Sequence, residues 1–473
     1  MGNPLAEPEE LARQAAYAGA EILITLTKFA ETAVTIRAQS QIRHTIFANI
    51  KDYLPPLKKL AFTLRREQKE GHRLTDLPGP ADFHWAKLLR RHPPQPPITD
   101  VSEQDTAVIQ FTSGTTGEPK GITLSHRNLV ANTLQIRAWL PQARDGDEVF
   151  LCVVPFSHVY GMTTAMNTAV SFGGSMALLP TFNAEEVLTH IKKYKPTLFP
   201  GVPTMYVALN TFPGVRKYDV QSIRACISGA APLPIEVKEA FEKLTKGKLV
   251  EGYGLSEASP VTHANPIYGR NKVGSIGLPL PGTEARIVDL QTGEPLPPGQ
   301  IGELVVRGPQ VMQGYWQDEA ATRQVIDLAG WLHTNDIARM DEDGYFQIIS
   351  RRQDMWQADD TAAPAFPRDV EEVIYEIPEV KEVVVVAPAN QPIAFVTLKE
   401  GVRLPAKTII AFCQRRLPAG QVPRLVLFVP ELPRNFVGKV LRRELISRYA
   451  QDLTAEAGSV GDYLAGLEEK DEG

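Results

Sequence analysis

Residues 111–121 of this 473-residue chain read Phe-Thr-Ser-Gly-Thr-Thr-Gly-Glu-Pro-Lys-Gly and follow the apolar run Ala107–Ile109. Glycines allow successive backbone N–H groups to converge on an anion, hydroxyl side chains add donors, and lysine supplies a point charge suited to phosphate. The stretch is not a Walker loop, because no Gly-Lys-Ser/Thr follows at the right spacing. We predict a phosphate-binding loop after a strand; a polar hairpin turn is the alternative. The residues expected to face phosphate are Thr112, Ser113, Gly114, Thr115, Thr116, Gly117 and Lys120.

The composition is ordinary for a soluble globular protein, and the length predicts at least two domains. A formal net charge of −5 with dispersed basic residues argues against nucleic acid as a main partner. Three cysteines, Cys152, Cys226 and Cys413, lie far apart without metal-ligand spacing, which predicts a cytoplasmic location. No signal-peptide pattern is visible at the N-terminus. Residues 149–184 carry no Asp, Glu, Lys or Arg, but prolines and glycines interrupt them, so we expect buried elements and no transmembrane span.

Beyond the glycine-rich loop, strand-like apolar runs alternate with helical patterns. We expect strands at 149–154, 175–179, 197–200 and 223–228, and helices at 159–172, 184–194 and 234–244. This alternation predicts an α/β fold of parallel sheets flanked by helices, with ligands at the carboxyl ends of the strands. Short strands between Gly/Pro turns at 274–307 predict a small β-barrel or meander.

The two ends of the chain have different patterns. Upstream we expect a helix at 8–20, a short strand at 20–26 and a basic surface helix at 56–70. Downstream, expected helices at 367–376 and 406–417 and strands at 380–387, 393–398 and 425–428 predict a compact α+β unit. We therefore divide the chain into a large domain at 1–351, a small C-terminal domain at 352–450, to which the family resemblance described below gives the role of a mobile lid, and an acidic tail at 451–473.

A histidine stands where an expected strand becomes a helix, in Pro155-Phe-Ser-His-Val-Tyr-Gly161. His158 could stabilise a carboxylate or a developing acyl phosphate by charge-assisted hydrogen bonding. A histidine at an apolar helix start is more often structural, and the uncharged helix behind it could equally be core packing or the wall of an apolar tunnel.

Two further motifs suit a nucleotide. Ser228-Gly-Ala-Ala-Pro-Leu233 offers bare backbone to a flat base. In Glu251-Gly-Tyr-Gly-Leu-Ser-Glu257 an aromatic ring between glycines can stack on a purine, and the carboxylate four residues later can bind Mg²⁺. The alternative for the second motif is a turn with an incidental glutamate.

Three charged residues complete the pattern. Gly330-Trp-Leu-His-Thr-Asn-Asp336 ends in an acid suited to ribose hydroxyls, and Arg351 follows in Ile348-Ile-Ser-Arg-Arg-Gln-Asp354. Lys439 follows a glycine just ahead of an expected helix. It is the best candidate for a mobile catalytic cation.

In order and spacing, these motifs resemble those of the adenylate-forming superfamily, and the resemblance extends from about Asn3 to Tyr449. Within that superfamily the chain is most similar to long-chain fatty acid–CoA ligases. This similarity rests on Val154-Pro-Phe-Ser-His-Val-Tyr-Gly161 and on the pattern at 46–60. The resemblance implies that a fatty acid reacts with ATP to give acyl-AMP and pyrophosphate. The small domain then rotates so that coenzyme A can attack.

The resemblance also implies roles for residues of this chain. Thr112–Lys120 would hold the β- and γ-phosphates, and Thr112 and Glu257 would bind Mg²⁺. Lys439 would bridge the carboxylate and the α-phosphate, forming the catalytic set with His158 and Glu257. Asp354 would be the hinge. The remaining nucleotide contacts would be Gly229, Ala230, Gly252, Tyr253 and Gly254 around adenine, Ser256 near the α-phosphate, and Asp336 and Arg351 at the ribose.

The chain departs from the family pattern in several places. It begins well inside that pattern, so we expect roughly a hundred residues of the large domain to be absent. Asn335 stands where the family has glycine, and Gln353 replaces a lysine beside the hinge. Asp359 and Asp360 replace a glycine pair in a longer loop, where side chains and negative charge should obstruct coenzyme A. The loop between Val386 and Ala394 is shorter.

Three functional readings follow. The first is an acyl-CoA ligase for medium or long chains, using ATP, Mg²⁺ and coenzyme A. The second is an acyl-adenylating protein with an impaired thioester step, and the third is a non-catalytic paralogue that binds nucleotide or acyl chains. Lys120, Glu257, Asp336 and Lys439 favour adenylation chemistry. Peripheral membrane contact and homo-oligomer formation stay open.

Overall fold

The fold is taken from a computed structural model that describes residues 2–92, 94–95, 97–111, 120–357, 364–434 and 440–449. The chain divides into two units, Met1–His126 with Met312–Glu319, and Arg127–Val311 with Ala320–Gly473. Residues 112–119, Asp359 and Asp360, Lys439 and the tail 451–473 lie outside the described residues.

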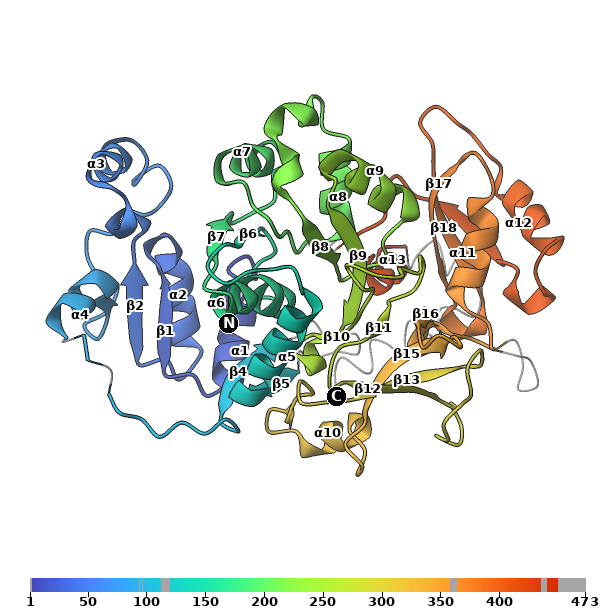
Figure 1. Cartoon of the computed structure of the whole chain (residues 1–473), viewed down its shortest axis with the longest axis horizontal. Coiled ribbons are helices and arrows are strands. Elements are labelled where there is room, and N and C mark those ends of the chain that lie inside the picture. The colour runs from blue at the N-terminus through green and yellow to red at the C-terminus, as the bar shows by residue number, and fades with distance from the viewer. Residues whose placement is uncertain are drawn as a thin grey trace. The chain divides into compact units, whose positions relative to one another are not determined.

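The first unit contains two small sheets (Figure 1). In one, β1 (Ile22–Leu26), β2 (His44–Ala48) and β3 (Phe83–His84) pair in parallel. In the other, β5 (Gly121–Ser125) pairs antiparallel with both β4 (Thr106–Phe111) and β14 (Gly314–Tyr315). Phe111 pairs with Gly121, so residues 112–119 connect the paired ends of two neighbouring strands. The helices of this unit are α1 (Pro8–Tyr17), α2 (Ala30–Ala38), α3 (Pro56–Arg65) and α4 (Trp85–Arg91).

The second unit is built on a largely parallel sheet. Its parallel pairs are β6 (Val149–Cys152) with β7 (Ser175–Leu178), and β8 (Ala225–Ser228) with β9 (Lys248–Gly254). Leu198 bridges β6 and β8, while β10 (Val261–Ala264) and β11 (Leu278–Pro279) continue the sheet in antiparallel fashion. The predicted strand at 197–200 is therefore present only as isolated bridges.

Helices cover both faces of this sheet (Figure 1). One face packs a buried cluster against three helices, and the other packs a second cluster against α5 and α6. The helices are α5 (His126–Trp139), α6 (Thr168–Ser171), α7 (Ala184–Tyr194), α8 (Pro203–Asn210) and α9 (Ile235–Thr245). This arrangement confirms the predicted α/β class.

Helix α7 shows how the sequence encodes these elements. Val187, Leu188 and Ile191 share one face and are fully buried. The Asn183 side chain caps the first turn by accepting the Glu186 N–H at 3.1 Å. Lys195 ends the helix in the left-handed conformation at φ 49°.

A π-helix, Gly161–Asn167, replaces the first part of the α-helix expected at 159–172. Its hydroxyls bond backbone carbonyls: Thr163 donates to Ser259 O at 2.7 Å, and Thr168 donates to Thr163 O at 2.7 Å. Side-chain donors that compete for carbonyls alter regular helical bonding, and π-turns are frequent at functional sites.

The region expected to be a small barrel or meander forms a four-stranded antiparallel sheet in the order β12-β13-β15-β16, and no closed barrel is found among the described residues. Its strands are β12 (Glu284–Val288), β13 (Ile301–Arg307), β15 (Leu332–Met340) and β16 (Phe346–Arg351). Helix α10 (Glu319–Val325) lies between β14 and β15 in the sequence.

The C-terminal part is the expected α+β unit. Alternate residues of its sheet face a cluster with α11 and α12 or a second cluster with α13. Its strands are β17 (Val380–Val386), β18 (Ile393–Leu398) and β19 (Leu425–Phe428), and its helices are α11 (Pro367–Tyr375), α12 (Ala406–Gln414) and α13 (Arg442–Arg448).

The three cysteines are buried and unbridged. Burial raises the pKa of Cys152 to about 12 and that of Cys413 to about 11, and it raises the pKa of Cys226 as well. Among the residues described, no helix has the length and apolar character needed to cross a membrane.

Candidate active site

Two of the predicted nucleotide segments lie side by side because β8 and β9 are adjacent parallel strands. Ser228, the last residue of β8, pairs with Glu251 of β9, so Gly229 follows beside Gly252. A Cβ atom on Gly229 would lie 3.0 Å from Cζ of Tyr160, which explains why bare backbone is needed there. Ala230 takes a positive φ of 70°. The structure thus brings both predicted adenine segments to one edge of the sheet.

Tyr253, Asp336 and Arg351 form one hydrogen-bonded cluster. Asp336 and Arg351 are paired across β15 and β16, and Arg351 Nε lies 2.7 Å from Asp336 Oδ1. The Tyr253 hydroxyl donates to Asp336 Oδ2. Asp336 is only 2% exposed. A buried carboxylate held between an arginine and a phenol is a fixed acceptor for ligand hydroxyls.

The charges around Arg351 connect this cluster with two other predicted residues. Burial lowers the pKa of Arg351, but Asp336, Tyr253, Glu257 and Asp354 together outweigh burial and raise it. Burial, followed by the charge of Asp336, raises the pKa of Tyr253. Glu257 lies with Ser256 in a 3₁₀ turn directly after β9. The predicted metal ligand, ribose pair and hinge acid therefore belong to one electrostatic cluster.

Asn335, a departure from the family glycine, has a positive φ of 56° and an exposed side chain. Asparagine is among the few residues that adopt this left-handed conformation readily. The Asn335 N–H donates to the buried Glu303 Oε1 at 3.0 Å. Asn335 therefore provides a left-handed backbone conformation next to Asp336 without a glycine.

His158 precedes the π-helix, at the corner expected from the sequence. Its Nδ1 accepts the backbone N–H of Tyr160 at 3.1 Å, so the neutral ring carries its proton on Nε2. Burial lowers the pKa of His158, which favours that neutral form. The Tyr160 hydroxyl is held by Ile227 O at 2.7 Å and Gly201 O at 3.1 Å. Tyr160 therefore connects His158 to the end of β8, a role that the sequence motif does not indicate.

Lys120 lies in the first unit, where its Nζ is 4.9 Å from the centre of the Tyr315 ring. Tyr315 was missed at the sequence level; the signal that could have found it is the glycine before an aromatic residue, as in Gly252-Tyr253. The other predicted loop residues, from Thr112 to Gly117, lie outside the described residues, as does Lys439.

Glu251 is a half-buried acid at the start of the second predicted adenine segment. Burial raises its pKa to about 7, against the opposing effects of the Leu233 N–H and the Arg368 charge. Arg368, at the start of α11, also donates to Ile348 O at 3.1 Å. No feature of the motif singles out this glutamate.

The predicted hinge acid contacts the C-terminal α+β unit. Asp354 Oδ2 lies 3.6 Å from Arg442 Nε at the start of α13, and Arg442 also bonds Glu371 at 3.0 Å. Gln353 is exposed. This ion pair links the predicted hinge acid to helix α13.

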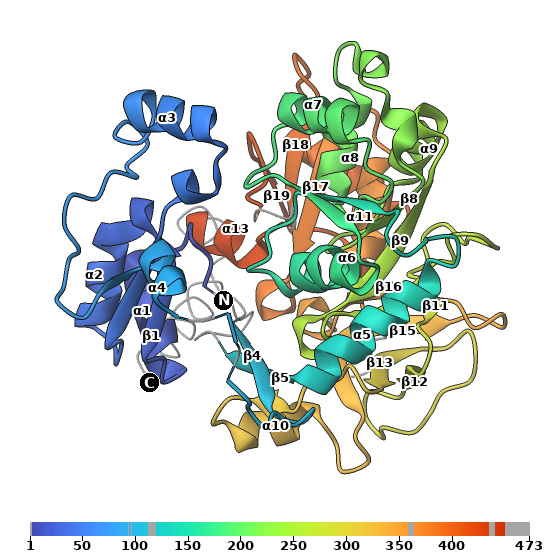
Figure 2. The same cartoon turned by 60° about the vertical axis from the view of Figure 1, so that its left-hand side comes forward.

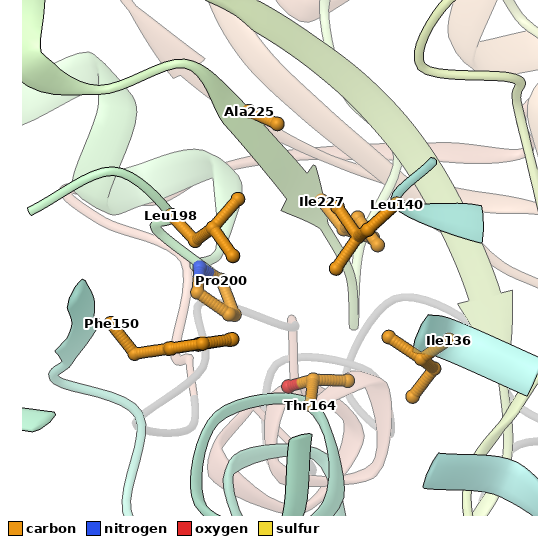
Figure 3. Close-up of a pocket in the computed structure, with 8 residues that line it drawn as sticks. All are labelled: Ile136, Leu140, Phe150, Thr164, Leu198, Pro200, Ala225 and Ile227. Carbon is orange, nitrogen blue, oxygen red and sulfur yellow. The ribbon is translucent and has the colours of Figure 1, made fainter. Parts of the chain in front are cut away.

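A small apolar cavity lies between α5, the π-helix and the parallel sheet (Figure 3). Its volume is about 10 Å³, close to the space of one water molecule. Ile227 connects it to the nucleotide segments, because a Cβ on Gly252 would lie 2.8 Å from Ile227 Cγ2. The lining residues are Ile136, Leu140, Phe150, Thr164, Leu198, Pro200, Ala225 and Ile227.

The acidic residues suit a magnesium ion that reaches the protein with a phosphate ligand. No group of three or more His, Cys, Asp or Glu side chains in the described parts of the chain could hold a metal alone. Mg²⁺ commonly binds one or two carboxylates together with substrate phosphates. Glu257 beside the Arg351 cluster fits that mode.

Comparisons with known proteins agree with this geometry. A family model described as AMP-binding enzyme matches residues 1–316, and one described as AMP-binding enzyme C-terminal domain matches residues 369–439. The chain is 43% identical over 460 residues to a long-chain-fatty-acid–CoA ligase of Bacillus subtilis, covering 95% of this chain and 81% of that protein. It is 31% identical to a 4-coumarate–CoA ligase of Pinus taeda, covering 95% and 80%.

Solved structures have the same fold. The ATP-bound MatB from Rhodopseudomonas palustris superposes with a TM-score of 0.78 at 28% identity, covering 95% of this chain and 83% of that one. An anthranilate CoA ligase in complex with anthranoyl-AMP gives 0.77 at 26% identity, covering 96% and 82%. Because a family model matches more than half of its length and a relative 43% identical is covered to 81%, the chain belongs to the AMP-binding enzyme family.

Proposed function

We propose that this protein activates a medium- or long-chain fatty acid with ATP, giving acyl-AMP and pyrophosphate, and then transfers the acyl group to coenzyme A. The Tyr253–Asp336–Arg351 cluster carries the proposal, because it presents a fixed buried acceptor beside two glycine-containing strand ends. The names of the B. subtilis and P. taeda relatives support the CoA ligase class.

The nucleotide would occupy the shared edge of β8 and β9. Gly229, Ala230, Gly252 and Gly254 offer backbone to adenine, and Tyr253 adds its ring face. Asp336 accepts the ribose hydroxyls while Arg351 holds that carboxylate in place at 2.7 Å. Ser256 would be near the α-phosphate. Thr112, Ser113, Gly114, Thr115, Thr116, Gly117 and Lys120 would hold the outer phosphates.

Thr112 and Glu257 would hold magnesium, which would supply positive charge to neutralise the phosphates. His158, neutral and protonated on Nε2, would donate a hydrogen bond to the acyl carboxylate. In the first half-reaction a carboxylate oxygen forms a bond to the α-phosphorus, and the bond to the β-phosphate oxygen breaks. Lys439 would stabilise the negative charge that builds between the two reactants.

The transfer to coenzyme A is the step that the departures from the family pattern should affect most. Asp359 and Asp360 provide side chains and negative charge where the resemblance to the family implies a glycine pair. They favour, as the second candidate, a protein that adenylates fatty acids but forms thioesters slowly. We place either activity in the cytoplasm, which suits three unbridged, buried cysteines.

Pyrophosphate release from purified protein, ATP, Mg²⁺ and fatty acids of increasing length, with and without coenzyme A, tests the proposal. Formation of acyl-CoA supports the full reaction. Pyrophosphate without acyl-CoA supports the impaired-thioester alternative, and no pyrophosphate from any carboxylate would leave a non-catalytic binding protein.

Replacing the proposed catalytic cation sharpens this test. Lys439→Ala should abolish adenylation but spare ATP binding, because its charge acts only as the transition state forms. ATP affinity by calorimetry and pyrophosphate release measure the two effects. Lys407→Ala, on the C-terminal helix α12, is the matched control and should change neither. Unchanged turnover of Lys439→Ala would contradict the role given to it.

A further inference from the structure

Helix α3, in the first unit, exposes a stripe of leucines. Leu57, Leu60 and Leu64 are 84%, 58% and 74% exposed. Their spacing of three and four residues places them on one face of the helix. Scattered exposed leucines are ordinary on a protein surface, but three in one row form a contiguous apolar strip.

The opposite face of α3 is anchored to the protein, so the stripe is held outward. Phe62 is 5% exposed and packs edge-on against the ring of His72, with centroids 5.8 Å apart. Just beyond the helix, the buried Glu67 binds Lys51 Nζ at 2.5 Å and Asn49 Nδ2 at 3.2 Å. The leucines therefore face solvent because these contacts hold the opposite face of α3 against the protein.

The position of α3 within its unit makes the stripe accessible. Figures 1 and 2 both show α3 at the outer tip of the unit, beyond the end of the β1–β2 sheet. Tyr53, three residues before the helix, is 68% exposed and accepts a hydrogen bond from Trp85 Nε1 at 2.5 Å. Tyrosine and tryptophan are favoured at the boundary between apolar and aqueous phases.

Basic residues are frequent in and around α3. Residues 51–73 contain seven Lys/Arg and three Asp/Glu, a net +4 within a chain of net −5. The three acids already have basic partners: Glu67 with Lys51, Glu70 with Arg66 at 2.5 Å, and Asp52 with Lys59 at 3.8 Å. Lys58 and Arg65, next to Leu57 and Leu64, form no ion pair with any described residue.

We propose that α3 docks this protein on an anionic phospholipid surface. A helix that is apolar on one side, basic beside it and not apolar enough to span lies in the interface with its apolar side chains below the headgroups. Leu57, Leu60 and Leu64 enter the acyl boundary, while Lys58 and Arg65 bind lipid phosphates. This docking does not depend on the proposed catalysis.

Vesicle flotation of the full chain, without nucleotide or fatty acid, tests the proposal. Wild-type protein should float with vesicles of equimolar phosphatidylcholine and phosphatidylglycerol, and far less with phosphatidylcholine alone. Leu57→Gln/Leu60→Gln/Leu64→Gln, which keeps good helix formers, should lower partitioning by about tenfold or more. Val273→Gln/Leu328→Gln, at exposed positions of the second unit, should float like wild type.

Charge reversal gives a second, independent readout. Lys58→Glu/Arg65→Glu should reduce flotation with anionic vesicles by about tenfold, and added salt should erase most of the difference from wild type. Lys192→Glu/Lys193→Glu makes the same charge change at exposed positions on α7 and should have little effect. Thermal unfolding of each variant shows that its fold is retained.

Three results would overturn the docking proposal. The first is equal flotation of wild type and the triple leucine variant, and the second is no flotation of wild type with anionic vesicles. The third is a dimer in light scattering that the triple variant dissociates, without vesicle binding, which would identify a second copy as the occupant. If the wild-type protein floats with anionic vesicles but releases no pyrophosphate from ATP with any fatty acid, that result would count against the proposed function alone.

Discussion

At the scale of single residues, the acceptor Asp336 is the most informative position. Asp336→Asn keeps the shape of the side chain but removes the negative charge that Arg351 and Tyr253 contact. Losing a charge-assisted hydrogen bond to the ribose should cost ~1.5–3 kcal/mol of ATP binding, and leaving Arg351 without its partner should cost ~1–3 kcal/mol of unfolding free energy.

Calorimetric titration with ATP and urea unfolding measure these two costs. Asp145→Asn is a suitable control, because it removes an equally close carboxylate–arginine contact at a side chain that is 71% exposed. If Asp336→Asn folds and binds ATP as tightly as wild type, Asp336 does not contact the nucleotide.

The neighbouring Asn335 allows a test of backbone conformation alone. Its side chain is exposed and its φ is 56°, so Asn335→Ala should lower the free energy of unfolding by about 1 kcal/mol through strain in the left-handed region. Asn335→Gly should stay within about 0.5 kcal/mol of wild type. Equal stability of the two variants would show that the conformation adds no strain.

At the scale of elements, the turn from β9 to β10 depends on Gly254. A Cβ on Gly254 would lie 1.9 Å from the carbonyl oxygen of Pro260, and backbone cannot move aside as a side chain can. We expect Gly254→Ala to destabilise the fold by about 3 kcal/mol or more. Gly269→Ala, whose nearest neighbour is a Pro266 side-chain atom at 3.3 Å, should cost far less. Thermal unfolding compares the pair, and similar midpoints would mean that the β9–β10 turn adjusts freely.

Elements with a single dominant pattern were predictable from the sequence. The periodic burial of α7 and the valine run of β17 gave their bounds within about one residue. The π-helix was not predictable, because it depends on where threonine hydroxyls find carbonyls such as Ser259 O. The strand at 197–200 was overpredicted, because Leu198 bridges β6 and β8 without forming a regular strand of its own.

The site was predictable as a set of residues but not as a set of contacts. Tyr253, Asp336 and Arg351 are each indicated by a local motif. Strand pairing aligns Asp336 with Arg351, but Tyr253 is 83 residues from Asp336 and lies in a different sheet, so only the tertiary fold brings it into contact. Tyr160 and Tyr315 were missed as partners because their roles arise from contacts with Ile227 O and Lys120. Local composition carries no record of such contacts.

At the scale of the whole molecule, Glu251 couples stability to pH. Its pKa is raised from the ordinary value of 4.5 to about 7, so the folded protein holds this proton more tightly than the unfolded chain. The associated stability is complete below about pH 4.5 and is lost as the pH rises through about 7. Glu251→Gln removes that loss, so the variant should become more stable than wild type at pH 8, by at most about 3 kcal/mol.

Urea unfolding of both proteins at pH 5 and pH 8 measures this difference. The gap between Glu251→Gln and wild type should widen with pH, whereas Glu239→Gln, exposed on α9, should track wild type at both values. A gap that is the same at both pH values would mean that Glu251 keeps an ordinary acidity in the folded protein.

The buried cysteines have a practical consequence for watching this molecule at work. Electrophilic dyes such as maleimides react with thiolates, and Cys152, Cys226 and Cys413 all hold their protons well above neutral pH. A cysteine introduced at an exposed position such as Gln68, just after α3, would therefore take up a fluorophore selectively without removal of any native cysteine. The wild-type protein would remain unlabelled. The fluorescence of a single environment-sensitive dye on Gln68→Cys could then report in real time what binds to the surface around α3.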